Sequence, residues 1–276
     1  MKKKKIIWII VLVFCLLIVV AGVVFMLNPF ADSDIKRADF TPTQAETVPE
    51  TAPAATETVA ETAAETVVAG DFGFKLAELG DFNVDFDELQ SVNKDIYAWI
   101  YIPNTKVDYP VVRNITDGDD TFYLEHNIYR QYQFSGTIFS ELQNHPDFHD
   151  PVTVLYGHNM LNGSMFATLH DFENPDFFAK NNTAFILTKD KVYTYLIYSA
   201  YTFDDRHILN SNFFNSKESF RAYLESTLHP YSLDANVREG VELTTDNRIL
   251  VLSTCTNGAA NTRYLVQGVL ANEQER

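Results

Sequence analysis

Residues 249–263 read ILVLSTCTNGAANTR and place Cys255 where an apolar run gives way to polar and turn-forming residues. The run 249–252 is typical of a buried β-strand, and a second strand-like run follows at residues 264–270. A hairpin joining the two runs would bring Arg263 back beside Cys255. There a permanent positive charge could favour a thiolate or face an oxyanion, so the stretch predicts both a strand pair and a candidate site.

Similar short runs recur from residue 98 onward, separated by turn residues. They predict eight strands, at residues 98–102, 107–112, 136–139, 152–156, 184–187, 192–201, 249–252 and 264–270. Helical periodicity precedes the first strand, with one apolar face formed by Phe86, Leu89, Val92 and Ile96. A longer helix, capped by Asn215 and ended by Pro230, precedes the last two strands. We therefore expect a mainly β fold with helical insertions, an eight-stranded β-barrel, with a two-sheet sandwich as the alternative.

The first 71 residues are organised differently. Four lysines at positions 2–5 precede an uncharged apolar run at residues 6–27, which is long enough to cross about 30 Å of hydrocarbon. Residues 1–30 are therefore predicted to be a transmembrane anchor with a cytoplasmic N-terminus. A cleaved signal peptide is the alternative, but no small-residue cleavage site follows the run. Residues 31–71, rich in Thr, Ala, Glu and Pro, predict a disordered extracellular stalk, and residues 72–276 are long enough for a single domain with a full core.

Charge and cysteine content narrow the possible functions. The formal net charge of −16 argues against a nucleic-acid partner, because phosphate binding requires a basic face. The two cysteines, Cys15 within the apolar run and Cys255, are too far apart in this arrangement to form a disulfide. An unpaired extracellular thiol suggests a reactive group, although a small buried apolar residue remains the alternative for Cys255. For Arg263 the alternative is a solvated surface residue.

Among seven histidines, only His158 directly follows a strongly apolar strand, after the turn-permitting Gly157. It is a candidate proton carrier, and a hydrogen-bonded structural histidine is the alternative. His145 and His149 lie among acidic residues, but no further ligand at suitable spacing supports a metal site. We expect neither a metal nor another cofactor. A phosphatase Cys-x5-Arg loop is excluded, because Asn261 occupies the position that would require arginine.

The combination of these segments resembles the sortases, membrane-anchored cysteine transpeptidases of Gram-positive cell surfaces. The resemblance covers about residues 85–271 and is strongest to class B. It rests on the stretches VNKDIYAWI at 92–100, DYPVV at 108–112, SGTIF at 135–139, YGHNMLNGSMF at 156–166 and LSTC at 252–255, followed by Arg263. Position 256 departs from the class, where an acidic residue is common, because Thr256 stands there.

The resemblance implies roles for particular residues. Cys255 would attack a threonine carbonyl in a C-terminal sorting signal of a secreted protein, His158 would act as acid and base, and Arg263 would stabilise the oxyanion. By position, Leu124, Tyr156 and Ser253 match residues that line the substrate groove of the class. Core packing is the alternative for Leu124 and Tyr156, and a simple strand-end hydroxyl for Ser253.

Two questions remain open at the level of sequence. The acceptor amine could belong to a peptidoglycan precursor of the cell wall or to a pilin. A non-catalytic extracellular module that holds an extended peptide in the same groove is the alternative from a different class.

Overall fold

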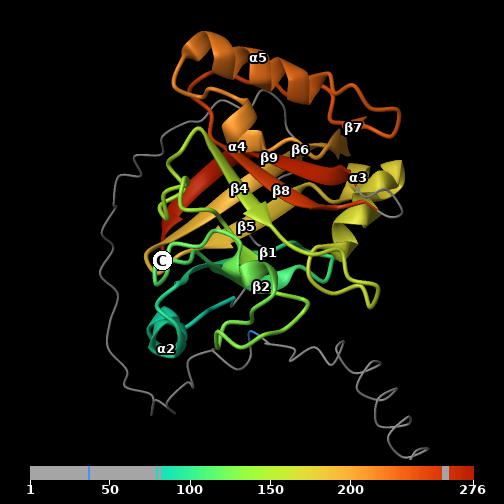
Figure 1. Cartoon of the computed structure of the whole chain (residues 1–276). Coiled ribbons are helices and arrows are strands. Elements are labelled where there is room, and N and C mark those ends of the chain that lie inside the picture. Colours follow the sequence, from blue (N-terminus) through green and yellow to red (C-terminus); the bar gives the residue numbers. More distant parts are fainter. Residues whose placement is uncertain (1–36, 38–78, 80–81, 257–260) are drawn as a thin grey trace, which may run out of the picture.

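The structure is a computed structural model that describes residues 82–256 and 261–276, together with residues 37 and 79 (Figure 1). The predicted anchor at 1–30 and, apart from residue 37, the predicted stalk at 31–71 lie outside the described residues. In the part of the chain that is described, no helix combines the length and the apolar character required to cross a bilayer.

Nine strands form one continuous sheet. They are β1 (Ile96–Tyr101), β2 (Asp108–Val112), β3 (Ile138–Phe139), β4 (Val152–Tyr156), β5 (Thr183–Leu187), β6 (Lys191–Asp204), β7 (Asn236–Val237), β8 (Ile249–Cys255) and β9 (Thr262–Glu275). The strand order is β5-β1-β2-β3-β4-β8-β9-β6-β7, and β5 also pairs with β6. This extra pairing closes eight strands into a barrel, while β7 pairs only with Ser199 and Ala200 of β6. The expected eight-stranded barrel is confirmed, and closure excludes the sandwich.

The sheet is mixed. The pairs β2–β3 and β4–β8 are parallel, and the other pairs are antiparallel. All eight expected strands are present, but β6 and β9 are longer than predicted, because cross-strand pairing continues through polar residues such as Asp204 and Thr262. The two-residue strand β7 was not predicted, since so short a segment carries no periodic signal.

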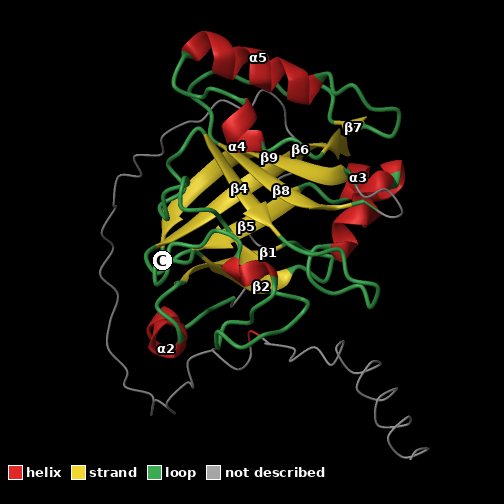
Figure 2. Cartoon of the chain, viewed as in Figure 1, coloured by secondary structure: helices red, strands yellow, loops and turns green. Residues whose placement is uncertain are grey.

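The helices lie on opposite sides of the barrel (Figure 2). On one side is α2 (Phe86–Val92), and on the other are α4 (Ile208–Ser211) and α5 (Lys217–Leu228). The helix α3 (Pro175–Lys180) and the 3-10 helices η3 (Phe122–Leu124) and η4 (Ala167–Glu173) complete the elements.

Two details of the helical predictions were wrong. We expected Val92 and Ile96 on the buried face of the first helix, but Val92 is 39% exposed and Ile96 already begins β1. The helix ends early because Asn93 adopts an extended backbone and its side chain bonds to Tyr123 Oη and the Ile128 carbonyl. The cap of α5 is Ser216 rather than Asn215, with the Ser216 side chain accepting a hydrogen bond from the Ser219 amide.

Alternation along β8 determines which way the candidate nucleophile faces. Leu250 and Leu252 pack inside the barrel, whereas Ile249 and Val251 pack in an outer apolar cluster beneath α4 and α5. Because side chains alternate between the two faces of a strand, Cys255 lies on the same outer face as Val251. The sulfur therefore opens onto the side of the barrel that α4 and α5 cover, and Cys255 is exposed there.

A buried polar network ties α5 to this outer face. Gln267 of β9 is fully buried, and its amide nitrogen donates to Tyr201 Oη at 2.6 Å. Its carbonyl oxygen accepts hydrogen bonds from Tyr198 and from Tyr223 of α5, both at 3.2 Å. Burial raises the pKa of these tyrosines, so the three phenols remain neutral. The network fixes the position of α5 over the sheet.

The loop between β2 and β3 is held by another buried group. Asp95 is 1% exposed and forms an ion pair with Arg130, while Tyr123 Oη donates to the same carboxylate at 2.6 Å. Thr116 donates to its other oxygen at 2.9 Å. Since breaking a buried pair leaves an uncompensated charge, these contacts hold the loop, which carries Leu124, against the barrel.

Candidate active site

Cys255 and Arg263 face each other across two neighbouring strands. Cys255 is the last residue of β8, and its register partner in antiparallel β9 is Arg263. Directly opposite residues in such a pair have Cα atoms about 5 Å apart. The expected pairing of the two strands is thus present and places Cys255 directly opposite Arg263. The Arg263 Nη1 also donates to the Thr262 carbonyl at 3.1 Å, which restrains the side chain.

Parallel pairing brings His158 to the same edge. In the β4–β8 pair, Tyr156 is in register with Ser253, and the Gly157 amide donates to the Ser253 carbonyl at 3.2 Å. His158 and Cys255 each come two residues after that registered pair. Adjacent strands are separated by about 4.8 Å, so the two residues leave neighbouring strand ends together.

A backbone carbonyl orients the imidazole of His158. Its Nε2 lies 2.8 Å from the Leu124 carbonyl oxygen, and the ring stacks on Phe134 with centroids 5.6 Å apart. A carbonyl can only accept, so Nε2 carries a proton in this arrangement. Nδ1 is then the ring nitrogen that can accept a hydrogen bond.

The Leu124 carbonyl in turn depends on Gly136. The backbone of Gly136 has φ = 61°, and a Cβ atom there would lie 2.4 Å from the Leu124 oxygen and 2.5 Å from the Tyr123 oxygen. Only glycine allows this close approach.

We expect Gly136→Ala to lower the free energy of unfolding by more than about 2 kcal/mol, because positive φ costs about 1–2 kcal/mol and the clash with two backbone carbonyls adds to it. Gly118→Ala is the matched control, since Gly118 has φ = 75° but nothing within 4 Å of its added Cβ. Denaturant unfolding curves compare the two variants. Equal losses of stability would contradict a role for the close approach.

All six candidate residues line one cavity of about 280 Å³. Leu124, which is 40% exposed, is not a core residue, and Ser253 is buried at the cavity floor. The other lining residues are Phe139, Gly157, Thr254 and Leu265 from the sheet side, and Phe203, Asp205, Arg206, His207 and Ile208 from the end of β6 and the segment leading into α4.

Tyr156 contributes a hydroxyl with an unused hydrogen bond. Its ring stacks on Phe139 with centroids 5.4 Å apart, and among the described residues its buried oxygen has no hydrogen-bond partner. Burial, with Glu141 and Asp120, raises the pKa of Tyr156, while Arg263 opposes the shift. The phenol therefore stays neutral.

Two residues that the sequence analysis did not select hold the backbone of Cys255. The Cys255 carbonyl lies 3.0 Å from Asn159 Nδ2 and 3.0 Å from His170 Nε2. The other ring nitrogen of His170 contacts Glu173 at 2.5 Å, and the ring stacks on Tyr264. Asn159 could have been noticed as the neighbour of His158. His170 carries no such signal, because η4 brings it back to the cysteine only in the folded chain.

Comparison with known proteins places this geometry in a family. A sortase-domain family model matches residues 100–271. Sortase B of Listeria monocytogenes is 30% identical over 199 residues, which cover 70% of this chain and 77% of that protein. Sortase B of Staphylococcus aureus is 29% identical over 179 residues, covering 64% of this chain and 70% of that protein.

Solved structures agree with the sequence comparison. The structure of Clostridium perfringens sortase B aligns with a TM-score of 0.60 and 34% identity, covering 67% of this chain and 98% of that one. A Staphylococcus aureus sortase B–substrate complex aligns with a TM-score of 0.59 and 26% identity, covering 68% and 84%. Because the matched region contains the barrel and the cavity with its cysteine, the chain belongs to the sortase family and is a sortase B-like cysteine transpeptidase.

Proposed function

We propose that this transpeptidase cleaves a C-terminal sorting signal of secreted proteins after threonine and transfers the new carboxyl end to an amine of the cell wall or of a pilin. The observation that carries the proposal is the convergence of Cys255, His158 and Arg263 on one cavity at the ends of β4, β8 and β9. The similarity to a sortase B solved with its substrate supports a peptide as the donor.

In the first half of the reaction, the Cys255 sulfur attacks the threonine carbonyl carbon. Arg263 faces the developing oxyanion and offers charge-assisted hydrogen bonds where negative charge forms. His158 gives a proton to the departing amine, the C–N bond breaks, and a thioester to Cys255 remains.

In the second half, the incoming amine attacks the thioester carbon and gives its proton to His158. The C–S bond breaks, and Cys255 leaves as the thiolate. Leu124, Tyr156 and Ser253 line the cavity in which the donor peptide lies.

The proposed cellular location of the protein rests on the sequence of residues 1–71, which lie almost entirely outside the described residues. We propose that residues 1–30 anchor the chain in the cell membrane with the N-terminus in the cytoplasm. Residues 31–71 then act as an extracellular stalk for the catalytic domain at 72–276. Export to the cell surface brings the enzyme to secreted donor proteins and to cell-wall or pilin amines.

The function is tested with the full chain in detergent, a library of pentapeptides containing Pro-x-Thr, and a set of primary amines. We expect cleavage after threonine, an acyl adduct on Cys255 detected by mass spectrometry, and an amide product with the amine. Reversible occupancy of the cavity without an adduct, for every peptide in the library, would contradict the proposal.

Arg263 offers a test of oxyanion stabilisation. We expect Arg263→Met to lower kcat by about 10²–10³-fold, the range for loss of an oxyanion donor. Arg263→Lys should recover part of this loss, since it retains the charge but lacks the planar two-donor group. Steady-state kinetics measure both variants, and Arg221→Met, at an exposed position on α5, is the control. Equal kcat values for Arg263→Met and the control would exclude the role.

A further inference from the structure

The main-chain carbonyl of Cys255 is held by side chains at the point where the β4–β8 ladder ends. One step earlier, the Ser253 carbonyl accepts a hydrogen bond from the Gly157 amide. Alternate residues of a strand bond to the same neighbour, so the next carbonyl of β8 on this side is that of Cys255. β4 has ended by this point, and the Cys255 oxygen lies 3.0 Å from Asn159 Nδ2 and 3.0 Å from His170 Nε2. Two side chains therefore continue the ladder at the nucleophile.

His170 reaches this carbonyl from η4 and is itself held in place. Its Nδ1 lies 2.5 Å from the Glu173 carboxylate on the same helix. Its ring stacks on Tyr264 of β9, with centroids 4.9 Å apart, and its side chain is only 10% exposed. The imidazole therefore has little room to move away from Cys255.

The partners of the two ring nitrogens define the protonation state of His170. A carboxylate and a carbonyl can only accept hydrogen bonds, so Nδ1 and Nε2 each carry a hydrogen when His170 bonds to both. In this arrangement His170 is an imidazolium, ion-paired with Glu173 and donating to Cys255. Hydrogen bonds from an ionised donor are about twice as strong as those between neutral groups.

Other ionisable groups stand around the ring on two elements. On η4, Asp171 interacts electrostatically with His170. On β9, burial raises the pKa of the stacked Tyr264, so that phenol stays neutral, and Arg263 is the residue before it. Glu173 is the group that contacts the ring directly, and it compensates the positive charge.

Loss of the Nε2 proton would reverse the contact with Cys255. The lone pair of Nε2 would then face the carbonyl oxygen, and two acceptors at hydrogen-bond distance repel each other. Asn159 Nδ2, which lies 3.1 Å from Nε2, could donate to the neutral ring in place of the Cys255 carbonyl. The support of the Cys255 carbonyl therefore depends on the charge of His170.

From these contacts we propose that protonated His170 is a positioning residue for the transpeptidase reaction. By donating to the Cys255 carbonyl it fixes the peptide plane that follows Cys255, and with it the direction in which the sulfur points. The inference rests on the proposed role of Cys255 as the nucleophile.

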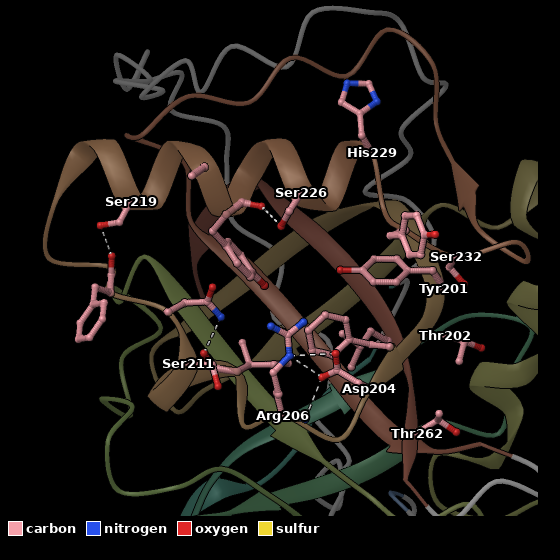
Figure 3. Close-up of a pocket in the computed structure, with 18 residues that line it drawn as sticks. Tyr201, Thr202, Asp204, Arg206, Ser211, Ser219, Ser226, His229, Ser232 and Thr262 are labelled. Atoms are coloured by element: carbon pink, nitrogen blue, oxygen red, sulfur yellow. Dashed lines mark hydrogen bonds and ion pairs between the residues drawn. The ribbon is translucent and has the colours of Figure 1, made fainter.

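His170 acts through Cys255 rather than on the substrate. It is not among the described residues that line the catalytic cavity. Nor does it belong to the described lining of the larger groove of about 750 Å³ between α5 and the ends of β6 and β9 (Figure 3). A substitution of His170 therefore leaves the walls of both spaces unchanged.

Two substitutions separate the contacts of the ring. The side-chain amide nitrogen of glutamine can occupy the place of Nε2, and that of asparagine the place of Nδ1. His170→Gln therefore retains the bond to Cys255, and His170→Asn retains only the bond to Glu173. We expect the acylation rate at saturating donor peptide to fall about tenfold in His170→Asn and to be largely retained in His170→Gln, because a small misplacement of a reacting group is costly. Single-turnover kinetics with the full chain in detergent measure this rate, and the donor affinity should be unchanged in both variants.

The pH dependence tests the charge. Glutamine has no proton to lose, so the acylation rate of the wild type should fall relative to that of His170→Gln as the pH rises and His170 becomes neutral. Glu173→Gln removes the carboxylate that stabilises the imidazolium, so the fall should begin at a lower pH than in the wild type. In the His170→Gln background, Glu173→Gln should not change this pH dependence.

His145 provides the matched control. Its Nδ1 also pairs with a carboxylate, that of Asp150 at 2.9 Å, and it is not among the described residues that line the cavity. His145→Gln and His145→Asn should both retain the wild-type acylation rate. Should His170→Asn fail to fold, the pH comparison of Glu173→Gln with the wild type still decides.

Three results would overturn the inference. They are equal acylation rates in folded His170→Gln and His170→Asn, a loss confined to donor affinity, and a ratio of the wild-type rate to the His170→Gln rate that does not change with pH. A wild type that forms no acyl adduct with any sorting peptide counts instead against the proposed function.

Discussion

Cys255→Ala is expected to lower the rate of transpeptidation by at least about 10⁴-fold. The variant lacks the nucleophile with which the other catalytic residues cooperate, so it retains only substrate binding. Stability should hardly change, since Cys255 is exposed and its side chain fills no part of the core. Product formation from a cleavable sorting peptide, measured together with a thermal melt, tests both statements.

Cys255→Ser is the matched variant. It retains a side chain of similar size and a hydrogen-bonding group, but a serine hydroxyl is a much weaker nucleophile unless a base activates it. We expect it to be nearly as inactive as Cys255→Ala and to bind the donor peptide with unchanged affinity. Turnover by Cys255→Ala above about a tenth of the wild-type rate would remove the thiol from the mechanism.

His158→Ala is expected to lower kcat by about 10²–10⁴-fold, the usual contribution of general acid–base catalysis. The loss has two parts, because the same imidazole protonates the departing amine and deprotonates the incoming one. Hydrolysis and aminolysis should therefore both fall, which steady-state and single-turnover kinetics can resolve.

His149→Ala is the control for this substitution, because His149 is about half exposed in a loop and contacts Asp147 rather than the cavity. It should retain wild-type activity. Should His158→Ala lose only stability and regain its activity when the chain is stabilised by bound donor, His158 would be a structural histidine, held by Leu124 and Phe134.

The strands could be predicted from local pattern because their signal is local. The continuous apolar run at 249–252 and the mostly apolar run at 264–270 are typical of strands buried on both faces, and neighbouring residues carry the whole signal. The residues at which helices and strands begin and end were less predictable. Val92 and Ile96 continue a helical spacing in sequence, but the bonds of Asn93 to the Tyr123–Ile128 loop end the helix there. That competing interaction comes from residues 30 and 35 positions away.

The candidate site likewise contains residues that the sequence could indicate and a residue that it could not. Cys255, His158 and Arg263 were selected because each stands at a predicted strand end, and the resemblance to a known family added Leu124, Tyr156 and Ser253. His170 could not be selected. Its contact with the Cys255 carbonyl joins positions 85 residues apart and exists only because η4 packs against β9.

The sequence by itself determined the strands, the charge and the polar residues at the strand ends, because periodicity and composition act over a few neighbouring residues. Only the tertiary structure decided that β4 and β8 pair in parallel and that the Leu124 carbonyl orients His158. It likewise decided that α5 leaves a second groove beside the cavity. These features depend on pairing and packing between distant segments, which are settled by closure of the whole barrel.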